Sequence, residues 1–203
     1  GKCVACPCET LVNLGDETIP LVQKVTHLGH ILRSDLSDTD ELKRIGRSFN
    51  AQFYTAISKF QSLGKIDIVL SLVNTFSTSF YGAESVNTDL CQGLKFLRSS
   101  VNLAYMRALQ LPYESVSQYF IAEGIMNADS MISYRILSHW KSLVMHSDSL
   151  YHYRILAAAN NHKVSQLCID NGIIPSTLWV MSKLKIKELV LTTWGRAKGL
   201  FPN

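Results

Sequence analysis

Three basic residues within about one helical turn are the first candidates for chemistry in this chain. Lys43, Arg44 and Arg47 lie in a segment whose apolar residues recur at the spacing of an amphipathic helix. Ammonium and guanidinium groups on the polar side of such a helix can bind phosphate oxygens through charge-assisted hydrogen bonds. Lys59 and Lys65 follow farther along the same region. These five residues predict contact with a nucleic acid backbone, and the alternative is a solvated helix face without a ligand.

A second group, of cysteines and histidines, has the side chains that zinc prefers. Cys3, Cys6 and Cys8 lie close together, and His27 and His30 are three positions apart. Thiolate and imidazole both bind zinc, but Cys-x2-Cys-x-Cys lacks a second ligand pair at standard spacing. Five cysteines, an odd number, argue against a closed disulfide framework. We therefore predict reduced cysteines and no metal site, with zinc as the alternative.

The motifs of several catalytic classes are absent from the sequence. No Asp-Asp pair is present to hold two metal ions for phosphoryl transfer. There is no Gly-x-Ser-x-Gly turn and no glycine-rich phosphate loop, and the six histidines are scattered. The sequence thus favours binding over catalysis.

The elements that must position these residues change in type near residue 33. Before it, short apolar runs alternate with turn residues, which predicts small antiparallel strands over residues 10–14, 18–22 and 25–28. Pro20 cannot donate to a ladder, so its strand is expected at a sheet edge. Two or three strands of this length bury little surface, and we expect them to depend on a neighbouring domain or helix.

From Ser37 onward the apolar period is that of helices. Asp38 followed by Glu41 matches a capping box, in which the carboxylate of the later residue returns to the start of the helix. One apolar stripe follows, and Gly64 is expected to end the helix. The stripe consists of Leu42, Ile45, Phe49, Phe53, Ile57, Phe60 and Leu63.

The same period continues to the end of the chain, interrupted by glycine and proline. The predicted fold is mainly α, a helical bundle preceded by a small antiparallel β-hairpin. Further helices are expected at residues 65–81, 88–111, 115–123, 129–146, 150–160, 163–170 and 182–198.

Composition limits the class of protein. Apolar residues make up 47% of the 203 residues, yet no run approaches the roughly 20 needed to span a bilayer, so we expect a soluble, intracellular protein without a membrane partner. The net charge of +4 comes entirely from residues 183–203, a weakly basic stretch compatible with phosphate contact. A start at Gly1, without an initiator Met, indicates a piece of a longer protein.

The order of four motifs resembles the region after the catalytic palm in reverse transcriptases of non-LTR retrotransposons. His27-Leu28-Gly29-His30 is similar to the primer grip of that family, although the family usually has Tyr or Phe where this chain has His27. The acidic-then-basic residues 38–47 resemble the start of its thumb. Residues 80–84 (Phe-Tyr-Gly-Ala-Glu) and 107–112 (Arg-Ala-Leu-Gln-Leu-Pro) resemble segments that recur behind the thumb.

The resemblance implies a division of the chain and a role for Lys2. Residues 1–34 would be the hairpin end of the palm with the primer grip, residues 35–112 a thumb-like bundle, and residues 113–203 a C-terminal helical extension. Lys2-Cys3-Val4 resembles a strand late in the palm whose lysine acts as general acid toward the leaving pyrophosphate. Lys2 is therefore the one catalytic residue that the resemblance implies.

The resemblance also implies a function and partners. The chain would be the non-catalytic C-terminal portion of an RNA-directed DNA polymerase, gripping the primer end and clamping an RNA–DNA or RNA template–primer duplex. Palm and fingers domains upstream in the same polyprotein would hold the catalytic aspartates and Mg²⁺, and this chain itself would need no cofactor. The parent element would act in nucleus and cytoplasm. The alternative is a helical protein-interaction scaffold derived from a decayed mobile element, without nucleic acid binding.

Overall fold

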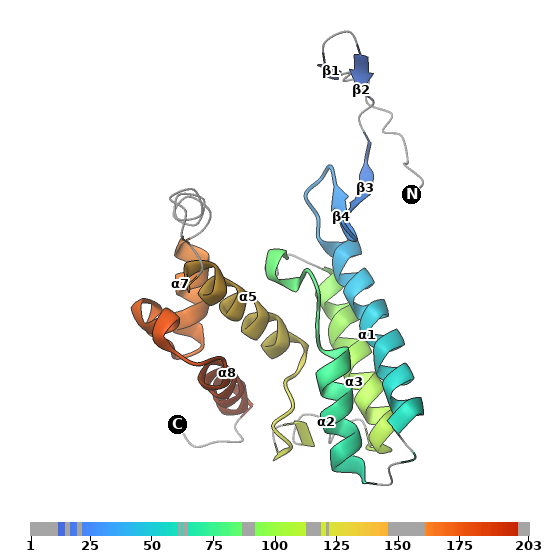
Figure 1. Cartoon of the computed structure of the whole chain (residues 1–203), viewed down its shortest axis with the longest axis vertical. Coiled ribbons are helices and arrows are strands. Elements are labelled where there is room, and N and C mark those ends of the chain that lie inside the picture. Colours follow the sequence, from blue (N-terminus) through green and yellow to red (C-terminus); the bar gives the residue numbers. More distant parts are fainter. Residues whose placement is uncertain are drawn as a thin grey trace.

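The computed structural model of the chain describes residues 12–14, 17–19, 22–60, 62, 65–86, 92–112, 119–120, 122–145 and 161–198. Within them the chain is mainly helical and begins with two small antiparallel ribbons (Figure 1). The predicted fold class is therefore confirmed. None of the helices in these ranges is both long and apolar enough to cross a membrane.

The two ribbons are separate two-stranded sheets. Strand β1 (Val12–Leu14) pairs with β2 (Glu17–Ile19), and β3 (Lys24–His27) pairs with β4 (His30–Arg33). Figure 1 shows the β3–β4 hairpin projecting beyond the N-terminal end of the first helix, with the other ribbon farther out. No residue from 22 to 40 is buried. The hairpin therefore lies on the helical core and forms no part of it.

Three helices lie side by side and form the first core. They are α1 (Thr39–Phe60), α2 (Ile66–Ser77) and α3 (Gln92–Leu109), with a short 3₁₀ turn, η2 (Ala83–Ser85), between the last two. Helix α1 contacts both others, and the first four members of its predicted apolar stripe are buried. At the centre, Tyr105 packs edge-on against Phe53 and Phe120. The Tyr105 hydroxyl donates to Asn74 Oδ1, and burial raises its pKa well above the ordinary value.

A second core follows toward the C-terminal end. It is formed by α5 (Ala128–Met145), α7 (Asn161–Asp170), the 3₁₀ helix η4 (Pro175–Val180) and α8 (Lys183–Ala197). Its buried residues are Leu137, Cys168, Ile173, Leu178, Ile186 and Val190. Helix α5 connects the two cores, because Met131 and Ile132 lie in the first and Leu137 in the second.

The largest differences between predicted and observed helix boundaries are at the ends of α1 and α2. Helix α1 ends at Phe60, short of Gly64, and α2 ends at Ser77, short of Tyr81. Beyond α2 the chain turns, with left-handed backbone at Phe80 (φ 41°) and Gly82 (φ 90°). The helix expected over 150–160 lies outside the described residues, as does most of that over 115–123.

The first core continues beyond residue 112, through Phe120 to Ile132. The division of the chain into residues 1–34, 35–112 and 113–203 stays a prediction.

Candidate nucleic-acid interface

The tip of the β3–β4 hairpin is an exposed two-residue turn. His27 and His30 are paired across the ladder, and Leu28 (φ 47°) and Gly29 (φ 81°) connect them with left-handed backbone. Positive φ at both central residues matches the right-handed twist of the strands, which is why such a turn favours glycine. The side chain of Leu28 is 78% exposed, and a Cβ at Gly29 would meet nothing within 4 Å. The tip is thus open to a ligand.

Asp40, in the first turn of α1, holds both strands of the hairpin near their open ends. Its Oδ2 lies 2.9 Å from Lys24 Nζ on β3 and 3.2 Å from Arg33 Nη1 on β4. The hydrogen bond from Lys24 is the main cause that lowers the pKa of this carboxyl, and Arg33 adds to it. A carboxylate at a helix N-terminus is further favoured by the helix dipole.

The neighbouring Glu41 is buried and accepts hydrogen bonds from two segments. Its side chain is only 5% exposed. Its carboxylate lies 3.0 Å from His30 Nδ1 and 2.9 Å from Ile31 N, both on β4. Arg44, one turn along α1, donates to it from Nε at 2.9 Å and from Nη2 at 2.5 Å. Burial by itself would raise the pKa of Glu41, but the hydrogen bonds from Arg44, Ile31 and His30 outweigh it and lower the pKa.

A third segment, the turn after α2, closes over this carboxylate. Arg44 Nη2 also donates to the Tyr81 carbonyl oxygen at 2.8 Å, and the Tyr81 ring lies 5.0 Å from the His30 ring. A Cβ on Gly82 would lie 2.3 Å from His30 Cε1 and 3.0 Å from Glu41 Oε1. The motif at 80–82 and the motif at 27–30 were separate in the sequence, and the structure brings them into contact.

The predicted phosphate-binding residues fall into two groups. Arg47, Lys59 and Lys65 are exposed and Lys43 is partly exposed. Lys43 and Arg47 lie on the side of α1 opposite the buried stripe, because residues four apart share one face. Arg44 differs, since two of its guanidinium nitrogens already bind Glu41 and the Tyr81 carbonyl. Its direct role at phosphate stays a prediction, and the geometry gives it a structural role.

Glu41 was not predicted as a site residue. The capping pattern assigned its carboxylate to the start of the helix, whereas the structure directs it to β4 and Arg44. The only signal in the sequence was an acidic residue in the first turn of a helix, close to a hairpin that contains histidines. This signal does not distinguish a carboxylate that caps the helix from one that binds the hairpin.

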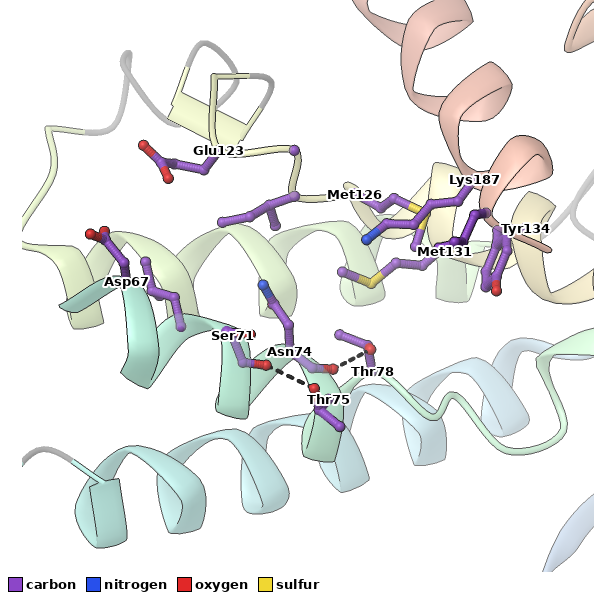
Figure 2. A pocket seen from close by; sticks show the side chains of 14 residues that line it. Asp67, Ser71, Asn74, Thr75, Thr78, Glu123, Met126, Met131, Tyr134 and Lys187 are labelled. Atoms are coloured by element: carbon purple, nitrogen blue, oxygen red, sulfur yellow. Dashed lines mark hydrogen bonds between the residues drawn. The ribbon is translucent and has the colours of Figure 1, made fainter. Parts of the chain in front are cut away.

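A polar cavity of about 490 Å³ is a second candidate site. It lies between α2, the segment 123–126, α5 and α8 (Figure 2). Figure 2 shows Asp67 and Glu123 at one end and Lys187 and Tyr134 at the other. Two carboxylates and one ammonium group do not favour a phosphate ligand, because the carboxylates repel it. Sequence reasoning did not anticipate this cavity.

Lys2 and the first three cysteines lie outside the described residues, so the predicted general acid stays a prediction. In the described ranges, no three or more His, Cys, Asp or Glu side chains converge on a potential metal position. Cys168 is a buried free thiol, and burial raises its pKa.

No family model, curated protein or solved structure matches the chain. Its function is therefore inferred from its own residues and their geometry.

Proposed function

We propose that this chain is the non-catalytic C-terminal portion of a non-LTR retrotransposon reverse transcriptase, which grips a primer end and clamps the template–primer duplex. One observation carries the proposal. An exposed hairpin tip is fastened at the N-terminal end of a helix whose outer face carries Lys43 and Arg47.

The hairpin tip suits a positioning role. Gly29 leaves the backbone uncovered, so a sugar-phosphate chain can approach it closely. His27, exposed beside it, can stack on a base or donate to phosphate. Holding a primer terminus in one place lowers the entropic cost of the reaction, which is the contribution expected of a primer grip.

The outer face of α1 suits a duplex backbone. Lys43 and Arg47, four positions apart, lie on this face, whereas Lys59, 16 positions or about 4.4 turns after Lys43, lies on another side of the helix. Contacts of Lys59, and of Lys65 just before α2, with the backbone stay separate predictions. A heteroduplex of A-like form hides its base edges in a deep groove, so cations along this face would recognise backbone and shape.

The salt dependence of binding tests this assignment. Affinity for an RNA–DNA hybrid should fall steeply with rising salt, because each phosphate contact releases counterions. The double variant Lys43→Ala/Arg47→Ala should weaken binding about equally for all sequences and reduce the slope of log K against log salt by about 2. The control is Lys183→Ala/Arg196→Ala, which removes the same charge from exposed positions on α8.

The proposal is wrong if the purified chain binds no hybrid, or if the control and the α1 variant have the same effect. An equal effect would mean that the outer face of α1 is not the specific binding face, because net charge or the basic stretch of α8 attracts the nucleic acid as strongly.

One observation favours the second candidate, a protein-interaction scaffold. On α2, Phe76 is 57% exposed, and its ring stacks on Phe60 of α1 at 5.9 Å. A cavity of about 500 Å³ lies beside these rings. Exposed apolar groups that lie together are typical of protein contacts. Binding to a protein partner that is insensitive to salt, without binding to a hybrid, would support this function.

A further inference from the structure

We propose that Glu41 is a positioning residue, which fastens the β3–β4 hairpin to the helical bundle so that the hairpin tip and the outer face of α1 contact one duplex together. This inference rests on the proposed function and deepens it. A buried carboxylate, which itself touches no nucleic acid, then determines how the parts of the interface are arranged.

The hairpin has little apolar surface to hold it in place. Val25 is 37%, Leu32 52% and Leu28 78% exposed, and no residue between 22 and 40 is buried. A two-stranded hairpin is marginally stable at best when it stands alone. Besides the half-buried Ile31 and the contact between the His30 and Tyr81 rings, its orientation on the bundle should therefore come from hydrogen bonds and ion pairs.

Glu41 supplies the buried part of those contacts. It accepts from a main-chain amide (Ile31 N, 2.9 Å) and pairs with a side chain (His30 Nδ1, 3.0 Å) on consecutive residues of β4. Attachment at two adjacent points restricts both the position and the rotation of the strand. Asp40 also pairs with the hairpin, but its side chain is 23% exposed and its partners are more accessible to water, so its pairs are more screened.

Arg44 and the turn after α2 complete the attachment. Arg44 joins Glu41 to the Tyr81 carbonyl, so the carboxylate is tied to the turn after α2 as well as to the hairpin. Gly82 allows this arrangement because any Cβ there would lie 2.3 Å from the His30 ring. Its φ of 90° also disfavours any other residue. Gly82 thus provides a second way to loosen the hairpin, one that leaves the carboxylate intact.

The first core does not depend on Glu41. Leu42, Phe49 and Phe53 fill it with apolar side chains whose exposures are 0 to 1%, and none of them depends on a hydrogen bond from Glu41. Loss of the Glu41 contacts should therefore release the hairpin and leave the bundle folded.

Hydrogen exchange and hybrid binding together test the inference. In Glu41→Gln and in Gly82→Ala, amides of residues 24–33 should exchange about tenfold faster or more, and core amides of α1 should change less than about threefold. Affinity for an RNA–DNA hybrid should fall about tenfold with an unchanged salt slope, since no phosphate-binding cation is removed. The two effects should be non-additive in the double variant, because both release the same hairpin.

Asp35→Asn is the matched control. It removes the same charge as Glu41→Gln from an exposed carboxylate, whose partners are Arg33 and the Ser37 amide. Removal of a negative charge by itself should slightly strengthen binding to nucleic acid. If charge alone mattered, Glu41→Gln would bind slightly more tightly, as the control should. A loss of affinity in Glu41→Gln is therefore not an effect of the removed charge.

Three results would overturn the inference. The first is unchanged hairpin exchange in both variants, and the second is faster hairpin exchange with full affinity for the hybrid. The third is equal acceleration of hairpin and core amides in Gly82→Ala as well as in Glu41→Gln, which would make the junction a general stability element. If the unmodified chain binds no hybrid, the proposed function fails, while the exchange data on the free protein still report whether Glu41 fastens the hairpin.

Discussion

At the scale of single residues, Glu41 shows how hydrogen bonds can lower the pKa of a carboxyl more than burial raises it. Taking a carboxylate out of water favours its neutral form, yet donors from Arg44, Ile31 and His30 keep it ionised and its pKa below the ordinary 4.5. Removing one partner of such a buried pair costs roughly 3–5 kcal/mol, whereas exposed pairs such as that between Arg33 and Asp35 contribute far less. The two kinds of ion pair at this junction are therefore unequal in energy.

Hairpin attachment should be sensitive to acid. A carboxyl whose pKa is lowered by folding stabilises the folded arrangement above its unfolded pKa, and this contribution is lost as pH falls through the folded pKa. The protection factor of the Ile31 amide, corrected for intrinsic exchange, should thus be constant above about pH 5 and fall below the ordinary pKa of 4.5.

Lys24 and Arg33 lower the pKa of Asp40 as well, so protonation of Asp40 in acid should also loosen the hairpin. The measurement is therefore best made in an Asp40→Asn background. There, Glu41→Gln should remove most of the remaining pH dependence between pH 3 and 5, and the rest should come from Asp35, whose pKa is lowered by its hydrogen bond with Arg33. A transition that persists at full size in this double variant would assign the acid sensitivity to another group.

The residues of the candidate site were predictable only in part. The exposed Arg47, Lys59 and Leu28-Gly29 turn follow from local pattern and turn chemistry. The contact between His30 and the turn at Gly82 could not be predicted, because it joins positions 52 apart and depends on how two helices and a hairpin pack. Local spacing carries no information about such a meeting point.

At the scale of elements, the helices were predicted well and their ends less well. The stripe of α1 is set by a local period, and its first four members are buried as expected. The end of α2 depends on where the chain must turn to reach η2. Helix boundaries depend on tertiary contacts, and the spacing of apolar residues carries no information about these contacts.

The two left-handed glycines next to the proposed interface should respond differently to substitution. Gly29→Ala adds only backbone strain, about 1–2 kcal/mol, because nothing lies within 4 Å of the new Cβ. Gly82→Ala adds the same strain and displaces the His30 ring. Exchange of amides 24–33 should therefore be faster in Gly82→Ala than in Gly29→Ala, and Gly29→Asn should recover most of the loss because asparagine tolerates positive φ. Equal effects would show that backbone strain alone, without the His30 contact, accounts for Gly82.

At the scale of the whole molecule, two cores share α5. The first holds α1, α2, α3 and the beginning of α5, with Trp194 of α8 packed against it, and the second holds the later part of α5 with α7, η4 and most of α8. Local pattern predicted most of these helices but not their grouping, because grouping depends on which apolar faces meet. The proposed interface lies entirely on the first core and its hairpin, so the second core should contribute little to nucleic acid binding.

Cavities of similar cost in the two cores test this separation. Ile186→Ala on α8 and Phe53→Ala on α1 each remove a fully buried side chain, and each should cost roughly 2–5 kcal/mol. Ile186→Ala should accelerate amide exchange in α7 and α8 and leave hybrid affinity within about twofold, since the interface does not include them. Phe53→Ala should loosen α1, α2 and α3 and weaken binding by tenfold or more, because the cations of α1 lose their fixed spacing. If Ile186→Ala weakened binding as much as Phe53→Ala, the second core would be part of the clamp, and the basic stretch at 183–198 would belong to the interface.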